Sequence, residues 1–264
     1  MGTRIRLGYG LLLSIGATAH SLNIVTFNGT RGGSSSLNSA PYLPTRTNLT
    51  SNYPGTSITG VSALTSAALA GADVAWIGAS FSGIQAITAL SVSEQAALRS
   101  FILGGGRALL FAENSTYAGA ASAVNASLVG QFGVTTTGTG AASSIHTFAS
   151  PSSVPATGHF GSVGTTLTSQ FPGWFSTIPS SASVVATSQG NGEPTIIRFG
   201  PGALGAGSGT VWMVSDSGYQ ATGGTVGGAW NTLYSNMLYE PVPEPENLVV
   251  LALGLLSLSR RRKR

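Results

Sequence analysis

Four polar residues lie at the ends of predicted buried strands and could bind a ligand there: Asn28, Ser80, Glu113 and Asp216. The carboxyl ends of parallel strands meet at one edge of a sheet, and α/β proteins bind their ligands at that edge. With the neighbouring Asn114, this candidate cleft could hydrogen-bond a polyol, or hold a metal ion through its carboxylates. The alternative, which we favour, is that these side chains cap helices or satisfy loop backbone groups. We therefore predict a ligand cleft at most, with no metal and no cofactor.

The chain offers few candidates for a catalytic nucleophile. Cysteine is absent, which excludes thiol chemistry, disulfide bonds and thiolate metal sites. Ser115 lies just past a predicted strand, but a serine nucleophile needs a nearby base. The three histidines, His20, His146 and His159, are distant from Ser115 in the sequence and form no paired motif. We therefore predict no catalytic residues, and keep a Ser-His hydrolase as the less favoured alternative.

The four tryptophans are the side chains best suited to stacking on a sugar ring: Trp76, Trp174, Trp212 and Trp230. Two of them, Trp76 and Trp212, fall inside predicted buried strands. Large aromatic side chains in such positions pack in the core. We therefore expect core packing for these residues rather than a platform for sugars.

Hydrophobic patterning predicts the elements that must position these residues. Short, nearly continuous apolar runs at residues 22–27, 73–77 and 107–111 are typical of strands buried on both faces. An apolar helical face is expected across residues 61–69, and Gly71 ends that helix. Strands and helices that alternate in this way predict a parallel sheet with helices on its faces.

The clearest helix spans residues 91–103. Ser91 and Glu94 have the spacing of a capping box, and the three glycines at residues 104–106 end the helix. The remaining expected elements are a loop over 29–57, a helix over 120–131, strands over 184–186, 195–199 and 210–214, turns over 190–192 and 200–209, and a last helix over 230–239.

The body resembles the class I glutamine amidotransferase-like superfamily. The resemblance rests on Leu-Ala-Gly-Ala-Asp-Val-Ala-Trp-Ile-Gly at residues 69–78, Phe-Ile-Leu-Gly-Gly-Gly at 101–106 and the apolar strand that follows. Residues 209–216, followed by Asn231 and Asn236, resemble the closing strand and helix of its non-enzymatic branches. The resemblance implies a flavodoxin-like α/β fold with a mostly parallel sheet and helices on both faces.

In active members of that superfamily, a sharp turn after the strand at residues 107–111 carries a cysteine nucleophile. Residues 111–116 here read Phe-Ala-Glu-Asn-Ser-Thr, so the amidotransferase activity does not carry over to this chain.

Charge is scarce and unevenly distributed. Charged residues make up 8% of the chain, and its formal net charge is +4. Between residues 20 and 243 there are five basic and six acidic residues, so the body is close to neutral. A nucleic-acid-binding surface needs clustered Lys and Arg, and the body has no such cluster. We therefore exclude nucleic acid as a partner.

The N-terminus has the pattern of a secretory signal. Arg4 and Arg6 precede an apolar stretch at residues 7–19, and Ala17 and Ala19 supply the small residues of a cleavage site. We predict a signal peptide over residues 1–19 and one α/β domain over residues 20–240.

The C-terminus has three consecutive parts. Val242, Pro243, Glu244 and Pro245 precede an apolar run at residues 248–258. The chain then ends in a basic cluster: Arg260, Arg261, Arg262, Lys263 and Arg264. The apolar helix would be about 20 Å long, short for a hydrocarbon core of about 30 Å.

This tail, residues 241–264, resembles the PEP-CTERM sorting tail of Gram-negative bacteria. That resemblance implies an inner-membrane intermediate with a transmembrane helix, cleavage by an exosortase, and an exopolysaccharide-rich biofilm as surroundings. The alternative is an uncut tail anchor. The expected partners are signal peptidase and exosortase during export, and then exopolysaccharide or other surface proteins.

Taken together, these features predict an exported cell-surface or extracellular-matrix protein that is not an enzyme. Its amidotransferase-like domain would serve for binding or structure. The alternative is a hydrolase of envelope polysaccharide or peptide.

Overall fold

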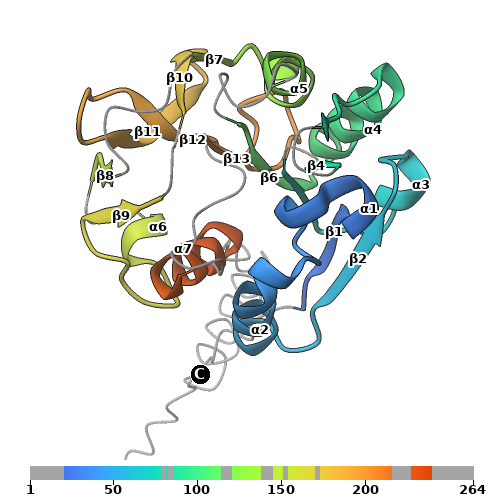
Figure 1. Ribbon diagram of the computed structural model, residues 1–264, viewed down its shortest axis with the longest axis horizontal. Helices are drawn as coiled ribbons and strands as arrows, with labels where there is room; N and C mark the ends of the chain where they lie inside the picture. The colour runs from blue at the N-terminus through green and yellow to red at the C-terminus, as the bar shows by residue number, and fades with distance from the viewer. Residues whose placement is uncertain are drawn as a thin grey trace, which may run out of the picture.

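The computed structural model describes residues 21–78, 81–82, 86–113, 121–137, 145–150, 154–169, 173–215 and 227–239. Its centre is a sheet of nine described strands (Figure 1). From one edge to the other the strands are β2 (Ser57–Val61), β1 (Asn23–Phe27), β3 (Val74–Gly78), β6 (Arg107–Phe111), β13 (Val211–Val214), β12 (Pro194–Phe199), β11 (Ala182–Ser188), β8 (Ile145–Phe148) and β9 (Thr166–Thr168). The expected α/β fold is confirmed.

The sheet is mixed. The first five strands of that order, β2 to β13, run parallel. The remaining pairs, from β13–β12 to β8–β9, are antiparallel. Four of the five parallel strands come from the first half of the chain, where strands and helices alternate, and β13 is the fifth. The antiparallel strands β8, β9, β11 and β12 come from residues 145–199, where the only described α-helix is the four-residue α6.

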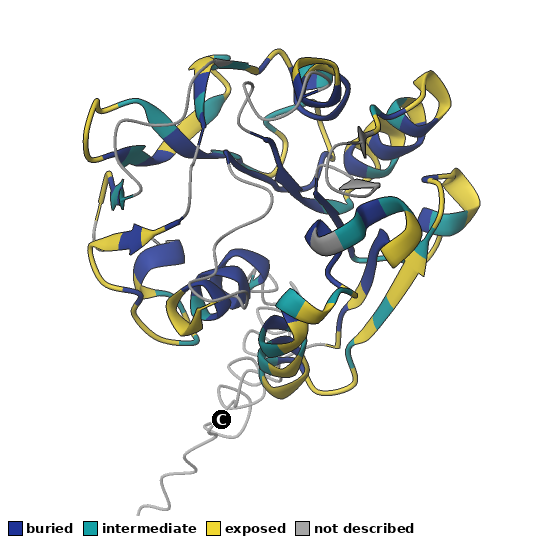
Figure 2. Ribbon diagram, viewed as in Figure 1, coloured by how far each residue is buried: buried dark blue, intermediate teal, exposed yellow. Residues whose placement is uncertain are grey.

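Alternate residues of the central strands feed two separate cores, one on each face of the sheet. In β3, Val74 and Trp76 belong to the first core, whereas Ala75 and Ile77 belong to the second. The first core is covered by α2 (Leu43–Asn52), α6 (Val154–Thr157) and α7 (Gly228–Leu238). The second is covered by α3 (Ser66–Leu69), α4 (Val92–Leu103) and α5 (Ala121–Leu128). Figure 2 shows the buried sides of the long helices turned toward the sheet.

Smaller elements complete the described chain. They are α1 (Gly29–Gly32), the 3-10 turns η1 (Gly33–Ser35), η2 (Ala40–Tyr42) and η4 (Gly130–Phe132), and two small antiparallel sheets, β7 (Thr135–Thr137) with β10 (Trp174–Thr177) and β4 (Phe81–Ser82) with β5 (Ala86–Ile87).

The structure confirms the residues that the sequence predicted to begin and end α4. Ser91 and Glu94 form the capping box, in which each side chain accepts a hydrogen bond from the other's backbone N–H. At the other end Gly105 has a φ of +98°, a conformation that favours glycine. The backbone of Gly209, just before β13, passes so close to this turn that a Cβ there would overlap the carbonyl oxygen of Gly106.

The loop expected over residues 29–57 was wrong, because this stretch contains α1 and the ten-residue helix α2. Helix α2 has little apolar character, but Thr45 and Leu49 are fully buried against α7. The helix expected across residues 61–69 was also too long. Val61 ends strand β2, and only α3 is helical, with Thr65 as its N-cap.

The other expected strands and helices agree with the structure within a few residues. No described helix is long and apolar enough to cross a membrane. The expected signal peptide and sorting tail lie outside the described residues.

Candidate functional site

The carboxyl edge of the parallel strands is where the sequence predicted a ligand cleft, and Asn28 lies there. Its Oδ1 accepts a hydrogen bond of 3.0 Å from the backbone N–H of Arg31, so Asn28 is the N-cap of α1. Its own backbone N–H donates to the carbonyl of Val61, 2.8 Å away. The favoured interpretation, that this residue caps a helix, is therefore confirmed for Asn28.

Glu113 lies at the same edge, two residues beyond β6, and is 6% exposed. Asn125 of α5 fixes its backbone, because Oδ1 of Asn125 accepts from the Glu113 N–H at 2.8 Å and Nδ2 donates to the Glu113 carbonyl at 2.7 Å. Nδ2 of Asn125 also donates to Oγ1 of Thr136. Asn125 was missed by the sequence analysis, although a polar residue on the buried side of a predicted helix was a signal.

Asn28 and Glu113 share this edge but follow strands that β3 separates. The other predicted members of the cleft, Ser80, Asn114 and Asp216, lie outside the described residues, as does Ser115. The described part of the chain contains no group of three or more acidic, histidine or cysteine residues that could hold a metal ion.

A second polar centre, which the sequence did not predict, surrounds His146. Its Nε2 lies 2.6 Å from Oγ of Ser169, and its Nδ1 lies 2.8 Å from Oγ1 of Thr195. The indole of Trp230 meets the imidazole edge-to-face at 5.3 Å. The three hydrogen-bonded residues are at most 3% exposed. Burial lowers the pKa of His146 to about 4, so the imidazole is neutral at pH 7.

This centre also belongs to the carboxyl edge. Thr195 is near the start of β12, which runs antiparallel to β13, and its carbonyl accepts from the N–H of Ser215 at 2.9 Å. Ser215 directly follows β13. The sequence had considered His146 only as a distant base for Ser115, whereas the fold pairs it with Ser169.

Two buried hydroxyl groups at this edge have no hydrogen-bond partner within the described residues. They are Oγ of Ser35 and Oγ of Ser215, on side chains that are each 1% exposed. Ser35 packs over the end of β3, because a Cβ on Gly78 would lie 3.1 Å from the Ser35 carbonyl oxygen. Buried polar atoms are nearly always paired, so these two hydroxyls are suited to hold a polar ligand or water.

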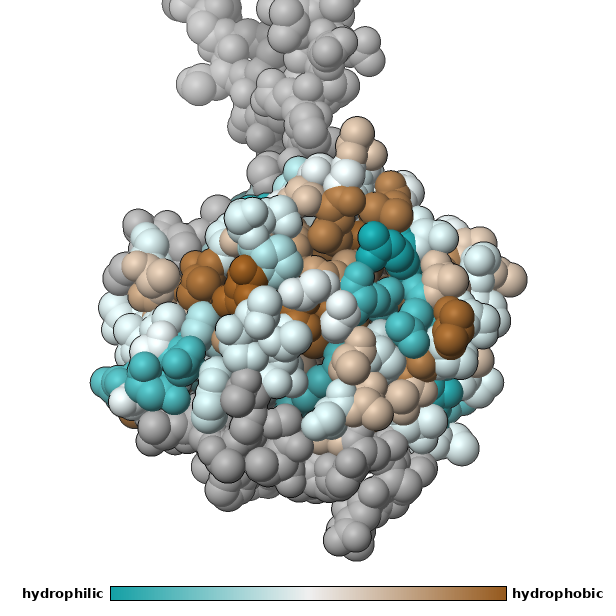
Figure 3. Space-filling view, turned by 90° about the horizontal axis from the view of Figure 1, so that it is seen from above, coloured by the Kyte–Doolittle hydropathy of each residue, from teal (hydrophilic) through white to brown (hydrophobic). Residues whose placement is uncertain are grey.

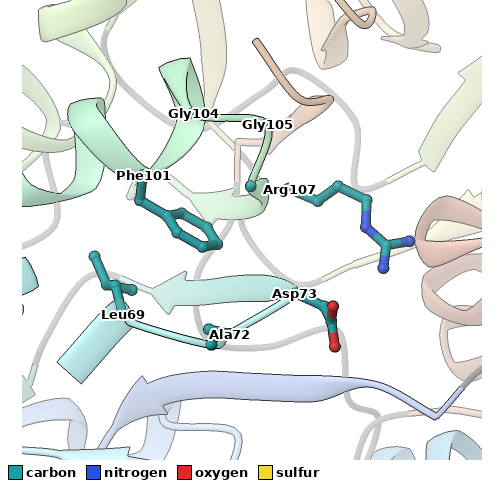
Figure 4. A pocket seen from close by; sticks show the side chains of 9 residues that line it. Leu69, Ala72, Asp73, Phe101, Gly104, Gly105 and Arg107 are labelled. Carbon is teal, nitrogen blue, oxygen red and sulfur yellow. The ribbon is translucent and has the colours of Figure 1, made fainter. Parts of the chain in front are cut away.

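A measurable cavity of about 380 Å³ lies at the opposite edge of the sheet, at the amino ends of β3 and β6. Figure 4 shows Phe101 and Leu69 at one end and the side chains of Asp73 and Arg107 at the other. Both charged groups already have partners. Oδ2 of Asp73 accepts from the Asn23 N–H at 2.8 Å, and Nη1 of Arg107 donates to the carbonyl of Leu238 at 2.6 Å. These bonds hold the ends of strands and of α7, so we assign this cavity no function.

The tryptophans do not form a stacking platform. Trp76, Trp212 and Trp230 are at most 4% exposed, and Trp174 is half-buried. Core packing, the expected role, is confirmed for the first three.

The fold and this edge define an α/β domain without cysteine whose carboxyl edge carries hydroxyl, amide and imidazole groups and the carboxylate residue Glu113. No family model and no curated protein matches the sequence.

Solved structures match the fold at low sequence identity. The mmIFT52 N-terminal domain is 11% identical with a TM-score of 0.60, over 83% of this chain and 99% of that domain. A thuA-like protein from Bacteroides uniformis is 10% identical with a TM-score of 0.53, over 89% and 94%. A cytoplasmic protein from Salmonella typhimurium is 15% identical with a TM-score of 0.55, over 82% and 97%. These likenesses show the fold alone.

Proposed function

We propose that this chain is an exported surface or matrix protein whose amidotransferase-like domain binds a polar ligand without converting it. The observation that carries the binding role is that the buried hydroxyls of Ser35 and Ser215 have no hydrogen-bond partner among the described residues, at the edge where α/β folds bind ligands. The absence of cysteine removes the nucleophile of the amidotransferase-like superfamily. Neutral hydroxyl and amide groups match a polyol or oligosaccharide better than a charged metabolite.

Export and sorting are supported by the positions of the two sequence signals relative to the first and last described elements. Strand β1 starts at Asn23, four residues after the expected cleavage site, and α7 ends at Leu238, four residues before the Val-Pro-Glu-Pro motif. Removal of both segments would therefore leave every described strand and helix intact.

Sorting is tested in a host that has an exosortase. The triple variant Pro243→Ala, Glu244→Ala, Pro245→Ala should accumulate as an unprocessed membrane precursor, whereas Glu246→Ala should be processed normally. Immunoblots of membrane and extracellular fractions distinguish the two forms. Normal processing of the triple variant would exclude the sorting role.

Ligand binding is tested on the purified full chain with cellohexaose, maltohexaose and chitohexaose, by saturation-transfer NMR. Ser35→Ala and Ser215→Ala should weaken any binding at least tenfold, and Ser93→Ala, an exposed serine on α4, should not. Unchanged binding by both Ser35→Ala and Ser215→Ala would show that the ligand site lies elsewhere on the protein.

A hydrolase is the second candidate, and the Ser169–His146–Thr195 arrangement favours it. The base, His146, is within hydrogen-bond distance of both a nucleophile, Ser169, and a residue that orients the base, Thr195, as in serine hydrolases. If Nδ1 carries the proton and donates to Thr195, Nε2 can accept the Ser169 proton as Oγ attacks an acyl carbon. Nε2 then returns that proton to the leaving group, and water hydrolyses the acyl-enzyme with the same base.

The burial of Ser169, His146 and Thr195 instead favours a structural role for them. A fluorophosphonate probe distinguishes a hydrolase from this structural role. A hydrolase would form a covalent adduct on Ser169, found by peptide mass spectrometry and lost in His146→Gln. An unlabelled Ser169 in folded protein would eliminate this candidate.

A further inference from the structure

The two edges of the nine-stranded sheet differ. One edge strand, β9, has three residues, whereas β2 at the other edge has five and lies at the rim of the molecule (Figure 1). Ser57, Thr59 and Gly60 of β2 are exposed, and Ile58 and Val61 are half-buried. Figure 2 shows β2 in the colours of exposed and intermediate residues along its length.

The hydrogen bonds of β2 show which backbone groups face outward. The N–H of Ser57 donates to the Leu22 carbonyl at 2.9 Å, and the Val61 carbonyl accepts from Asn28 at 2.8 Å. Backbone groups of successive residues in a strand point to opposite sides. Ser57, Thr59 and Val61 therefore pair with β1, and the N–H and C=O groups of Ile58 and Gly60 point away from the sheet.

The devices that usually protect an edge strand are missing here. Such edges carry Lys, Pro, a bulge or an inward-pointing charge. No charged residue occurs between Arg46 and Asp73. The register between β1 and β2 is continuous over all five residue pairs, so β2 has no bulge.

Few large hydrophobic side chains are exposed on the described part of the surface. The exposed large hydrophobic residues of the described chain are scattered: Leu43 is on α2, Val92 and Leu103 are at opposite ends of α4, and Val184 is on β11. On the face seen in Figure 3, apolar residues form small patches among hydrophilic ones. Contact through this surface would therefore rely on backbone hydrogen bonds rather than on an apolar patch.

We propose that β2 pairs antiparallel with β2 of a second copy of this chain, about a two-fold axis at Thr59. In this register Ile58 lies opposite the partner's Gly60, and these two residues exchange their outward N–H and C=O groups, on both sides of the axis. Thr59 then faces the partner's Thr59 as a non-hydrogen-bonded pair, and threonine pairs are favourable in this position. A neutral strand is suited to pair with its own copy, because no like charges meet.

The contact is weak in free solution. Five residues on each side bury far less than the roughly 1,200 Å² of a stable interface. Chains held together on one surface have a high effective concentration, which favours such pairing. This inference is independent of the sorting role, because purified chain at high concentration should also pair.

The absence of cysteine makes a sharp crosslinking test possible. In the purified full chain, Thr59→Cys should form a disulfide-linked dimer under mild oxidation, because Cβ atoms of facing residues lie about 4.5–5.5 Å apart. Ser57→Cys is the matched control on the same strand. Copies of residue 57 would be on the order of 13 Å apart in this register, at about 3.4 Å per residue.

Val92→Cys is a second control, because Val92 is 82% exposed and lies on α4, away from β2 in the sequence. Its crosslinking rate measures random collisions and any association of chains through the tail. The proposal expects Thr59→Cys to crosslink at least tenfold faster than both controls. Similar rates for all three variants, or no dimer from folded Thr59→Cys, would overturn it. Circular dichroism of each variant establishes that it is folded.

Discussion

Nη2 of Arg31 lies 3.2 Å from Oε2 of Glu94, and this ion pair joins α1, just after β1, to the first turn of α4. The same carboxylate accepts from the backbone N–H of Ser91 at 2.9 Å and of Leu64 at 3.2 Å. Arg31 also donates to the carbonyl of Ala89. One carboxylate therefore fixes three segments of the chain beside the carboxyl edge.

Replacing Glu94 should reduce stability in a pH-dependent way. Burial raises the pKa of Glu94, but hydrogen bonds from Ser91 and Leu64 and the charge of Arg31 outweigh it and leave the pKa below its usual 4.5. The stabilisation is present above pH 4.5 and lost as the pH falls through the lower folded-state pKa. We expect Glu94→Gln to lower the free energy of unfolding by about 1–3 kcal/mol at pH 7, and by less at pH 3.

Urea titrations at both pH values measure this difference, with Ser100→Ala, at an exposed position of the same helix, as a control. An equal loss at pH 7 and pH 3 would show that the charge of Glu94 contributes nothing.

His146 should make the protein less stable in acid. Burial lowers its pKa to about 4, whereas an unfolded histidine titrates near 6.5. The unfolded chain therefore binds the proton first, and stability falls as the pH drops from 6.5 to 4. The loss is on the order of 3 kcal/mol. Unfolding titrations across this range should show that slope, and His146→Gln should flatten it. Imidazole NMR signals of His146 that titrate near pH 6.5 in the folded protein would contradict this prediction.

Gly209→Ala should be severely destabilising. An added Cβ would overlap the Gly106 carbonyl oxygen and lie 2.5 Å from that of Gly105, and both are backbone atoms that cannot rotate away. We expect a loss of about 3 kcal/mol or more. Gly228→Ala is the control, because its Cβ would meet nothing within 4 Å and alanine favours the helix. Thermal unfolding midpoints of the Gly209→Ala and Gly228→Ala variants measure the difference. Equal midpoints would contradict the close approach of Gly209 to the backbone of Gly105 and Gly106.

Asn125→Ala should destabilise the backbone around Glu113 at the carboxyl edge of the sheet. It leaves the buried N–H and C=O of Glu113 without their side-chain partner, which costs about 2–4 kcal/mol. Ser122→Ala, on the exposed side of the same helix, should have little effect. Hydrogen exchange of the Glu113 amide measures the local change, and unchanged protection in Asn125→Ala would disprove this role.

Local signals predicted the central elements well. The apolar runs of β3 and β6 and the capping box of α4 depend on neighbouring residues, so the sequence contains all the information that they need. Helix α2 was missed because its stability depends on distant partners. Oγ1 of Thr45 donates to Asn231, 186 residues away, and Nδ2 of Asn52 donates to Ser235. Such hydrogen bonds leave no periodic pattern in the sequence.

The sequence by itself determined that thiol chemistry is impossible, that the body is nearly neutral, and that its central strands are buried on both faces. These conclusions require only residue types and their local order. Only the tertiary structure placed His146 between Ser169 and Thr195, and left the hydroxyls of Ser35 and Ser215 at the same edge without partners in the described part of the chain. The physical reason is that these groups come from separate strands and turns, and strand order and register alone decide which of them meet.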